Sequence, residues 1–165
     1  MSGRVKDAGP RAAVRGVGGE SLSPVELAAW RGMLRAHAAV VRRLDEHLRA
    51  GHGMSLSSYE ALMLLGEAPG RRLRISELSS ATLLSVSGMS RMVDRLEREG
   101  LVARRSCETD GRGAEVVLTD AGRERLRAAR VSHLAGVRDE FLSRVAEDDL
   151  RTLARVWEDV EPERG

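Results

Sequence analysis

The sequence has few of the residues that build covalent or metal crosslinks. Among 165 residues there are one cysteine and four histidines, so an internal disulfide cannot form and a usual structural zinc site lacks ligands. No apolar run approaches the length that crosses a bilayer. Residues 1–20 are polar and glycine-rich, where a secretory signal would need an apolar stretch. We expect a cytoplasmic protein without a metal or cofactor.

Composition instead favours one helix-rich globular domain. Apolar residues make up 42% of the chain and charged residues 32%, which is typical of a soluble folded protein. The formal net charge of +2 hides an asymmetry, because residues 71–112 carry nine arginines against six acids, whereas residues 146–165 carry seven acids against three arginines. A basic middle segment suits a polyphosphate partner, although a solvated arginine-rich surface would look the same.

The chain divides into a tail, one long helix, a central lobe and a C-terminal helical part. Residues 1–21 lack hydrophobic periodicity and predict a flexible basic tail. The next segment, 22–54, starts with Ser23, Pro24 and Glu26, a combination that begins helices. Apolar positions then recur in steps of three and four, a pattern typical of an interface between helices. The stripe consists of Leu27, Trp30, Leu34, Val41, Leu44 and Leu48, and His37 interrupts it.

Residues 55–119 predict two short helices followed by a hairpin. Ser57 and Glu60 form a capping-box pattern that would begin a helix ending at Pro69-Gly70. Residues 75–78 predict a brief strand-like link into a helix over 77–82. Ser85 would cap a helix running to Glu99, with Gly100 ending it, and the buried stripe of this helix is expected to be Val86, Met89, Val93 and Leu96.

Two extended segments, 101–106 and 114–118, flank a polar turn and predict a β-hairpin. Thr119 would cap a long helix from Asp120 to about Val145, and the acids from Glu147 favour the start of a last helix. The expected fold is mainly α with a small β-hairpin wing: a winged helix-turn-helix over 55–119, with dimerisation helices at 22–54 and 120–165.

The helix over 85–99 is the candidate recognition helix, because its exposed face combines short hydroxyl groups with arginines. The run from Ser85 to Val102, together with Asp110-Gly111-Arg112 and Leu118-Thr119, resembles the recognition helix and wing of the MarR family of regulators. The resemblance covers about residues 24–160. It implies a homodimer that binds a pseudo-palindromic operator in double-stranded DNA. The sequence shows no nucleophile motif and no phosphate-binding glycine loop, and its histidines lack catalytic spacing, so we expect no enzymatic activity.

The resemblance assigns DNA contacts to the recognition helix, to its approach and to the wing. At the wing, Arg112 would enter a minor groove with Asp110 orienting it. The expected DNA-binding residues are Ser57, Arg74, Ser76, Ser85, Val86, Ser87, Ser90, Arg91, Asp94, Arg95, Arg104, Asp110 and Arg112. The expected dimer contacts are Leu27, Leu34, Leu150, Leu153 and Trp157.

An effector is also implied by the resemblance: a small aromatic or phenolic molecule, held near Trp30, His37 and Tyr59, that releases the protein from DNA. Two alternatives stay open. One is a redox-responsive regulator acting through Cys107, whose neighbours Arg104 and Arg105 supply positive charge. The other is a helical module that binds an acidic protein.

Overall fold

The computed structural model describes residues 21–82, 84–106 and 114–160. The chain divides into two units, residues 1–35 and 36–165. Helix α1 (Pro24–His52) begins in the first unit and ends in the second. Its start follows the prediction, because the Ser23 backbone N–H donates to Glu26 Oε2 at 2.7 Å and the Glu26 N–H donates to Ser23 Oγ at 3.3 Å. None of the described helices is long and apolar enough to cross a membrane.

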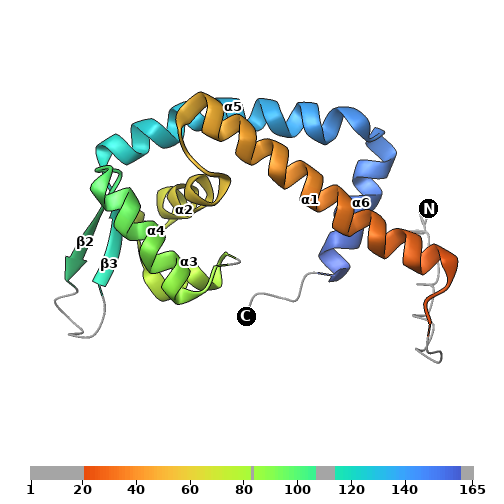
Figure 1. Ribbon diagram of the computed structural model, residues 1–165, viewed down its shortest axis with the longest axis horizontal. Coiled ribbons are helices and arrows are strands. Elements are labelled where there is room, and N and C mark those ends of the chain that lie inside the picture. Colours follow the sequence, from red (N-terminus) through yellow and green to blue (C-terminus); the bar gives the residue numbers. More distant parts are fainter. Residues whose placement is uncertain (1–20, 83, 107–113, 161–165) are drawn as a thin grey trace, which may run out of the picture. The chain divides into compact units, whose positions relative to one another are not determined.

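The second unit contains the remaining elements (Figure 1). They are α2 (Leu56–Glu67), the 3₁₀ turn η1 (Pro69–Arg71), β1 (Arg72–Arg74), α3 (Ile75–Ser80), α4 (Val86–Arg98), β2 (Val102–Ser106), β3 (Ala114–Leu118), α5 (Asp120–Glu140), the 3₁₀ turn η2 (Leu142–Arg144) and α6 (Glu147–Val160). This order is the mainly α fold with a small wing that the sequence predicts.

The wing is a three-stranded antiparallel sheet in the order β1-β3-β2. Strands β2 and β3 form the predicted hairpin, with Val102 opposite Leu118. The third strand corrects the prediction of a strand-like link over 75–78: those residues belong to α3, and the strand lies just before them. Arg72 pairs with Val117, which lies 45 positions further along the chain, so local sequence alone does not reveal this strand.

Three predicted helix boundaries are also corrected. Helix α2 is capped by Ser55, not Ser57, because Ser55 Oγ accepts the Ser58 N–H at 3.1 Å. Helix α3 ends at Ser80 and not at residue 82. Helix α5 ends at Glu140, since Phe141 leaves the helical region with φ −128° and ψ −63°.

The core lies where α2, α3 and α4 pack against the wing strands and α5. Leu62, Leu78 and Met89 are fully buried there. In α4 the buried face is Met89, Met92, Val93 and Leu96, so the predicted stripe is wrong at Val86, whose side chain is 57% exposed. Val86 is the first residue of α4, and Met92 occupies the core in its place.

The junction between α4 and the wing is a tight turn. Gly100 has φ +73°, and its N–H donates to Glu97 O while the Leu101 N–H donates to Leu96 O, both at 2.9 Å. This hydrogen-bond pattern is the Schellman ending that favours glycine. Thr119, which caps α5 as predicted, donates its backbone N–H to Leu101 O at 3.1 Å, so α4, the wing and α5 meet at one point.

Candidate nucleic-acid interface

Helix α4 presents a polar face to solvent. Ser85 caps it by accepting the Gly88 N–H at 3.2 Å, and the Ser85 and Ser87 hydroxyls lie 3.2 Å apart. Free N–H groups and a partial positive charge at a helix N-terminus favour an anion such as phosphate. The predicted contact residues on this face are exposed or half-buried: Ser85, Val86, Ser87, Ser90, Arg91, Asp94 and Arg95.

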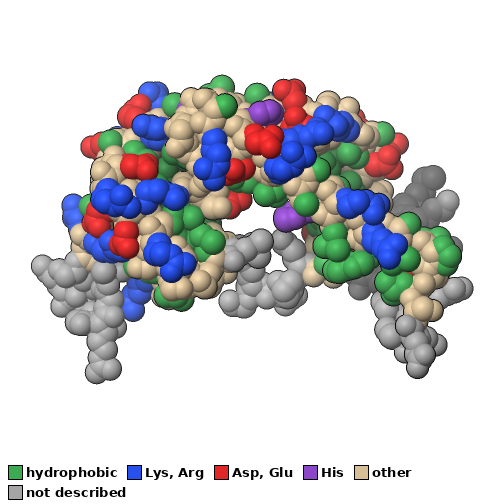
Figure 2. All heavy atoms as spheres, viewed as in Figure 1, with side chains coloured by type: hydrophobic (Ala, Val, Ile, Leu, Met, Phe, Trp, Pro, Cys, Tyr) green, Lys and Arg blue, Asp and Glu red, His purple; other side chains and the backbone are tan. Residues whose placement is uncertain are grey.

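Basic and acidic side chains are intermingled around α4 and the wing strands in Figure 2. Arg91 and Arg98 are exposed and, among the described residues, neither has an ion-pair partner within 4 Å. Their guanidinium groups are therefore available to phosphate oxygens or guanine edges. This combination of open arginines and short hydroxyl groups is what groove binding requires.

Arg104 holds the wing against α4. Its guanidinium donates to Asp94 Oδ1 at 2.5 Å and to Glu97 Oε2 at 2.7 Å, and its backbone N–H donates to Glu97 Oε1 at 2.8 Å. The backbone hydrogen bond from Arg104, assisted by its side chain, lowers the pKa of Glu97. Sequence reasoning placed Asp94 and Arg104 at DNA but missed Glu97, which lies one helical turn beyond Asp94 on the same face.

Arg95 connects α4 to the start of α2. Its Nη2 donates to Ser58 Oγ at 2.7 Å, and Ser58 Oγ lies 2.8 Å from the capping hydroxyl of Ser55. Ser58 is buried, so a charged donor here satisfies a hydroxyl group that has little access to water. Sequence reasoning missed Ser58, because only the fold brings it next to Arg95.

The remaining predicted contacts lie on the approach to α4. Ser57 is half-buried near the start of α2 and Ser76 is exposed on α3. The Arg74 backbone N–H donates to Glu77 Oε2 at 2.6 Å and so caps α3. The turn before α4 is held by Ser79, whose hydroxyl donates to Leu84 O at 2.8 Å. Cys107, Asp110 and Arg112 of the predicted turn lie outside the described residues, as do residues 1–20 of the predicted tail.

The predicted dimer residues are apolar groups with partial exposure. In the first unit Leu27 is half-buried and Leu34 is 47% exposed. In the second unit Leu150 and Leu153 are half-buried and Trp157 is 40% exposed. Large apolar side chains left open in a single chain are expected where a second chain covers them.

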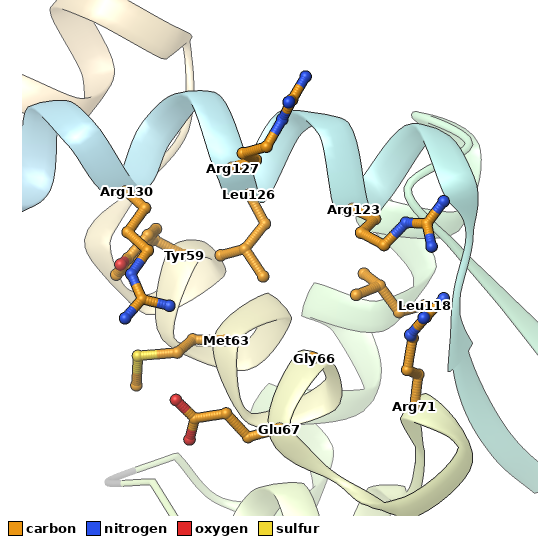
Figure 3. Close-up of a pocket in the computed structure, with 10 residues that line it drawn as sticks. All are labelled: Tyr59, Met63, Gly66, Glu67, Arg71, Leu118, Arg123, Leu126, Arg127 and Arg130. Carbon is orange, nitrogen blue, oxygen red and sulfur yellow. The ribbon is translucent and has the colours of Figure 1, made fainter.

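Within the second unit, the predicted effector residues His37 and Tyr59 line different cavities. His37 lines a cavity bounded by α1, α2 and the segment after α3. Tyr59 lines a different cavity, between α2 and α5 (Figure 3), and its ring centroid lies 4.5 Å from that of His133. Trp30 is exposed in the first unit.

The burial of His133 is expected to make the free energy of unfolding depend on pH. Burial lowers the pKa of His133 from its ordinary 6.5, and its Nδ1 is buried with no hydrogen-bond partner among the described residues. The folded state therefore binds this proton less well than the unfolded state, and stability falls as pH drops below about 6.5. We expect His133→Phe to reduce this loss. Urea unfolding of both proteins at about pH 7.5 and 5.5 tests it; an equal loss in both would contradict it.

Comparison with known proteins identifies transcriptional regulators as relatives. A sequence model described as the MarR family matches residues 52–113. The transcriptional repressor YetL of Bacillus subtilis is 33% identical over 92 residues, which are 56% of this chain and 55% of YetL. The transcriptional repressor MprA of Escherichia coli is 28% identical over 102 residues, 62% of this chain and 57% of MprA. The chain thus spans little more than half the length of these curated relatives.

Two solved structures from Streptomyces coelicolor match more completely. The MarR-family transcriptional regulator AbsC is 34% identical and has a TM-score of 0.79; the match covers 86% of this chain and 95% of AbsC. The MarR-family transcriptional regulator Sco3205, solved in complex with DNA, is 32% identical with a TM-score of 0.81; the match covers 89% of this chain and 95% of Sco3205.

Proposed function

Because the chain belongs to the MarR family of transcriptional regulators, we propose that it binds double-stranded DNA as a homodimer and regulates transcription, most simply as a repressor. The observation that carries this proposal is the exposed face of α4, where the side chains of Ser87 and Arg91 are accessible to solvent near the capped N-terminus of the helix. Sco3205, similar over nearly its whole length, was solved with DNA bound. The relatives in this family are transcriptional regulators and not enzymes, so enzymatic activity is not proposed.

In this proposal α4 lies in a major groove and each subunit reads one half-site. Two-fold symmetry then requires a pseudo-palindromic operator with half-site centres about 10 bp apart. Arg104 acts mainly as a positioning residue, since its guanidinium is held by Asp94 and Glu97. Arg112 and Asp110 of the wing tip, together with Ser57, Arg74 and Ser76, stay predicted contacts.

The test of α4 is the substitution Arg91→Ala, measured on an operator selected from random duplexes. A good bidentate contact to a base contributes about 1–3 kcal/mol, so affinity should fall roughly tenfold or more. The logarithm of affinity should also fall steeply with the logarithm of salt concentration for the wild type, by about 0.9 per neutralised phosphate. Arg138→Ala removes the same charge from exposed α5 and should change affinity little. If both substitutions reduced operator affinity equally, α4 would not be part of the DNA interface.

We further propose that a small ligand releases the protein from its operator. A cavity of about 710 Å³ beside α1 and α2 supports this, because ligand sites of small molecules have about this size. The redox alternative through Cys107 rests on a residue outside the described ranges, and no observation favours it.

A further inference from the structure

The larger of the two cavities has an apolar wall. Its volume is about 710 Å³, against about 220 Å³ for the cavity between α2 and α5. Apolar side chains from α1, α2 and the segment before α4 line it; they are Val41, Leu56, Met63, Leu64 and Leu84. Such a surface can cover the body of a small apolar molecule, so the polar groups of the wall decide which molecule binds.

Two of the charged groups on this wall are already paired. Asp45 Oδ2 accepts from Arg49 at 2.6 Å and its Oδ1 accepts the Leu56 N–H at 2.8 Å. Arg42 lies 3.4 Å from Glu46. These pairs lie along α1 itself and leave little charge for a ligand to meet.

Two carboxylates on this wall, those of Glu60 and Glu67, have no partner among the described residues, and Glu60 is the one that borders only this cavity. It is half-buried on α2, and among the described residues its carboxylate has no hydrogen bond and no ion pair. Burial is the main cause that raises the pKa of Glu60, while the charge of His37, on the same cavity, acts in the opposite direction. A carboxylate that has lost part of its hydration without gaining a partner is stabilised by any cation brought beside it. Glu67, the last residue of α2, lines the same wall, and its carboxylate also has no partner among the described residues.

The smaller cavity has the opposite character. Figure 3 shows Leu126 turned toward its centre, with Arg71, Arg123 and Arg130 around it and Arg127 turned away. Glu67 borders both cavities, whereas Glu60 borders only the larger one. Four arginines line the smaller cavity, whereas among the described residues Arg42 is the arginine that lines the larger one.

We propose that the larger cavity binds an organic cation with an apolar body, whose ammonium group pairs with Glu60. This ligand class differs from the phenolic effector that the sequence resemblance implies. The regulatory consequence, release from the operator, rests on the proposed function; the binding itself does not.

Three probes with the same phenyl-alkyl body test the charge preference: phenylbutylamine, phenylbutanol and phenylpentanoate. Calorimetry on the full chain without DNA, at about pH 7, keeps the amine protonated. The amine should bind about tenfold or more tightly than the alcohol, and the acid most weakly. An acid that binds as tightly as the amine, or an amine no tighter than the alcohol, overturns the proposal.

Glu60→Gln identifies the residue responsible. It should remove the preference for the amine and leave the affinity for the alcohol unchanged, which also shows that the variant is folded. Glu158→Gln, on exposed α6, removes the same charge elsewhere and should keep the preference. If Glu60→Gln retains the full preference, the assignment to Glu60 is wrong.

A second measurement separates this inference from the proposed function. Phenylbutylamine is titrated into the complex of protein and operator, and the fraction of bound DNA is followed. If the protein binds the amine through Glu60 but binds no DNA duplex, the proposed function is refuted and the ligand inference is not. Protein that binds its operator but not the amine would refute the ligand inference alone.

Discussion

Gly122→Ala is expected to lower the free energy of unfolding by about 3 kcal/mol or more, the range of severe overpacking. A Cβ at Gly122 would lie 2.0 Å from Leu101 O and 2.7 Å from Leu118 Cδ1. The carbonyl cannot move away freely, because it accepts hydrogen bonds from the backbone N–H and the hydroxyl of Thr119. For a chain of this size the melting temperature should fall by about 10 °C, as measured by circular dichroism.

The matched control is Gly51→Ala. A Cβ at Gly51 would meet nothing within 4 Å, and the residue is helical and exposed. Alanine there should stabilise the protein slightly, by about 0.5–1 kcal/mol, because glycine loses more conformational freedom in a helix. Equal melting temperatures for the two variants would show that the contact between α5 and Leu101 is looser than described.

Leu34→Asp is expected to dissociate the proposed dimer and to weaken operator binding by roughly a hundredfold or more. Leu34 is a large apolar side chain, 47% exposed in the single chain, on the stripe that the heptad spacing assigns to the partner. A carboxylate buried there without a partner is costly. A monomer binds one half-site at a time and loses the gain of joined binding, about 10² to 10⁴ in affinity.

Ala28→Asp provides the comparison, because Ala28 is exposed on the same helix but off the apolar stripe. Light scattering after gel filtration gives the oligomeric state, and titration of labelled operator gives the affinity. A dimer that persists in Leu34→Asp would place the interface elsewhere. Loss of the dimer with operator affinity retained would mean that one subunit suffices for binding.

Local signals in the sequence predicted most of the fold. The capping residues Ser23, Ser85 and Thr119, and the glycine at position 100, each act within a few residues of chain, so their effects can be predicted without tertiary structure. Strand β1 could not be predicted this way, because three residues form a strand only when β3 is beside them.

The candidate site was predicted less completely, for the same reason. The exposed face of α4 follows from helical periodicity, with an error at Val86, which the first turn leaves open to solvent. The roles of Arg95 and Arg104 could not be predicted, since both side chains are held by residues that only folding brings near. Among the three residues suggested for a ligand, His37 and Tyr59 lie on different cavities.

The hydrogen bond between Arg95 and Ser58 also links α4 to the first turn of α2. The first turn of α2 is fixed at one end to α1, where Asp45 accepts the Leu56 N–H, and at the other to α4, through Arg95. We therefore expect these two hydrogen bonds to couple the angle between α1 and α2 to the position of α4.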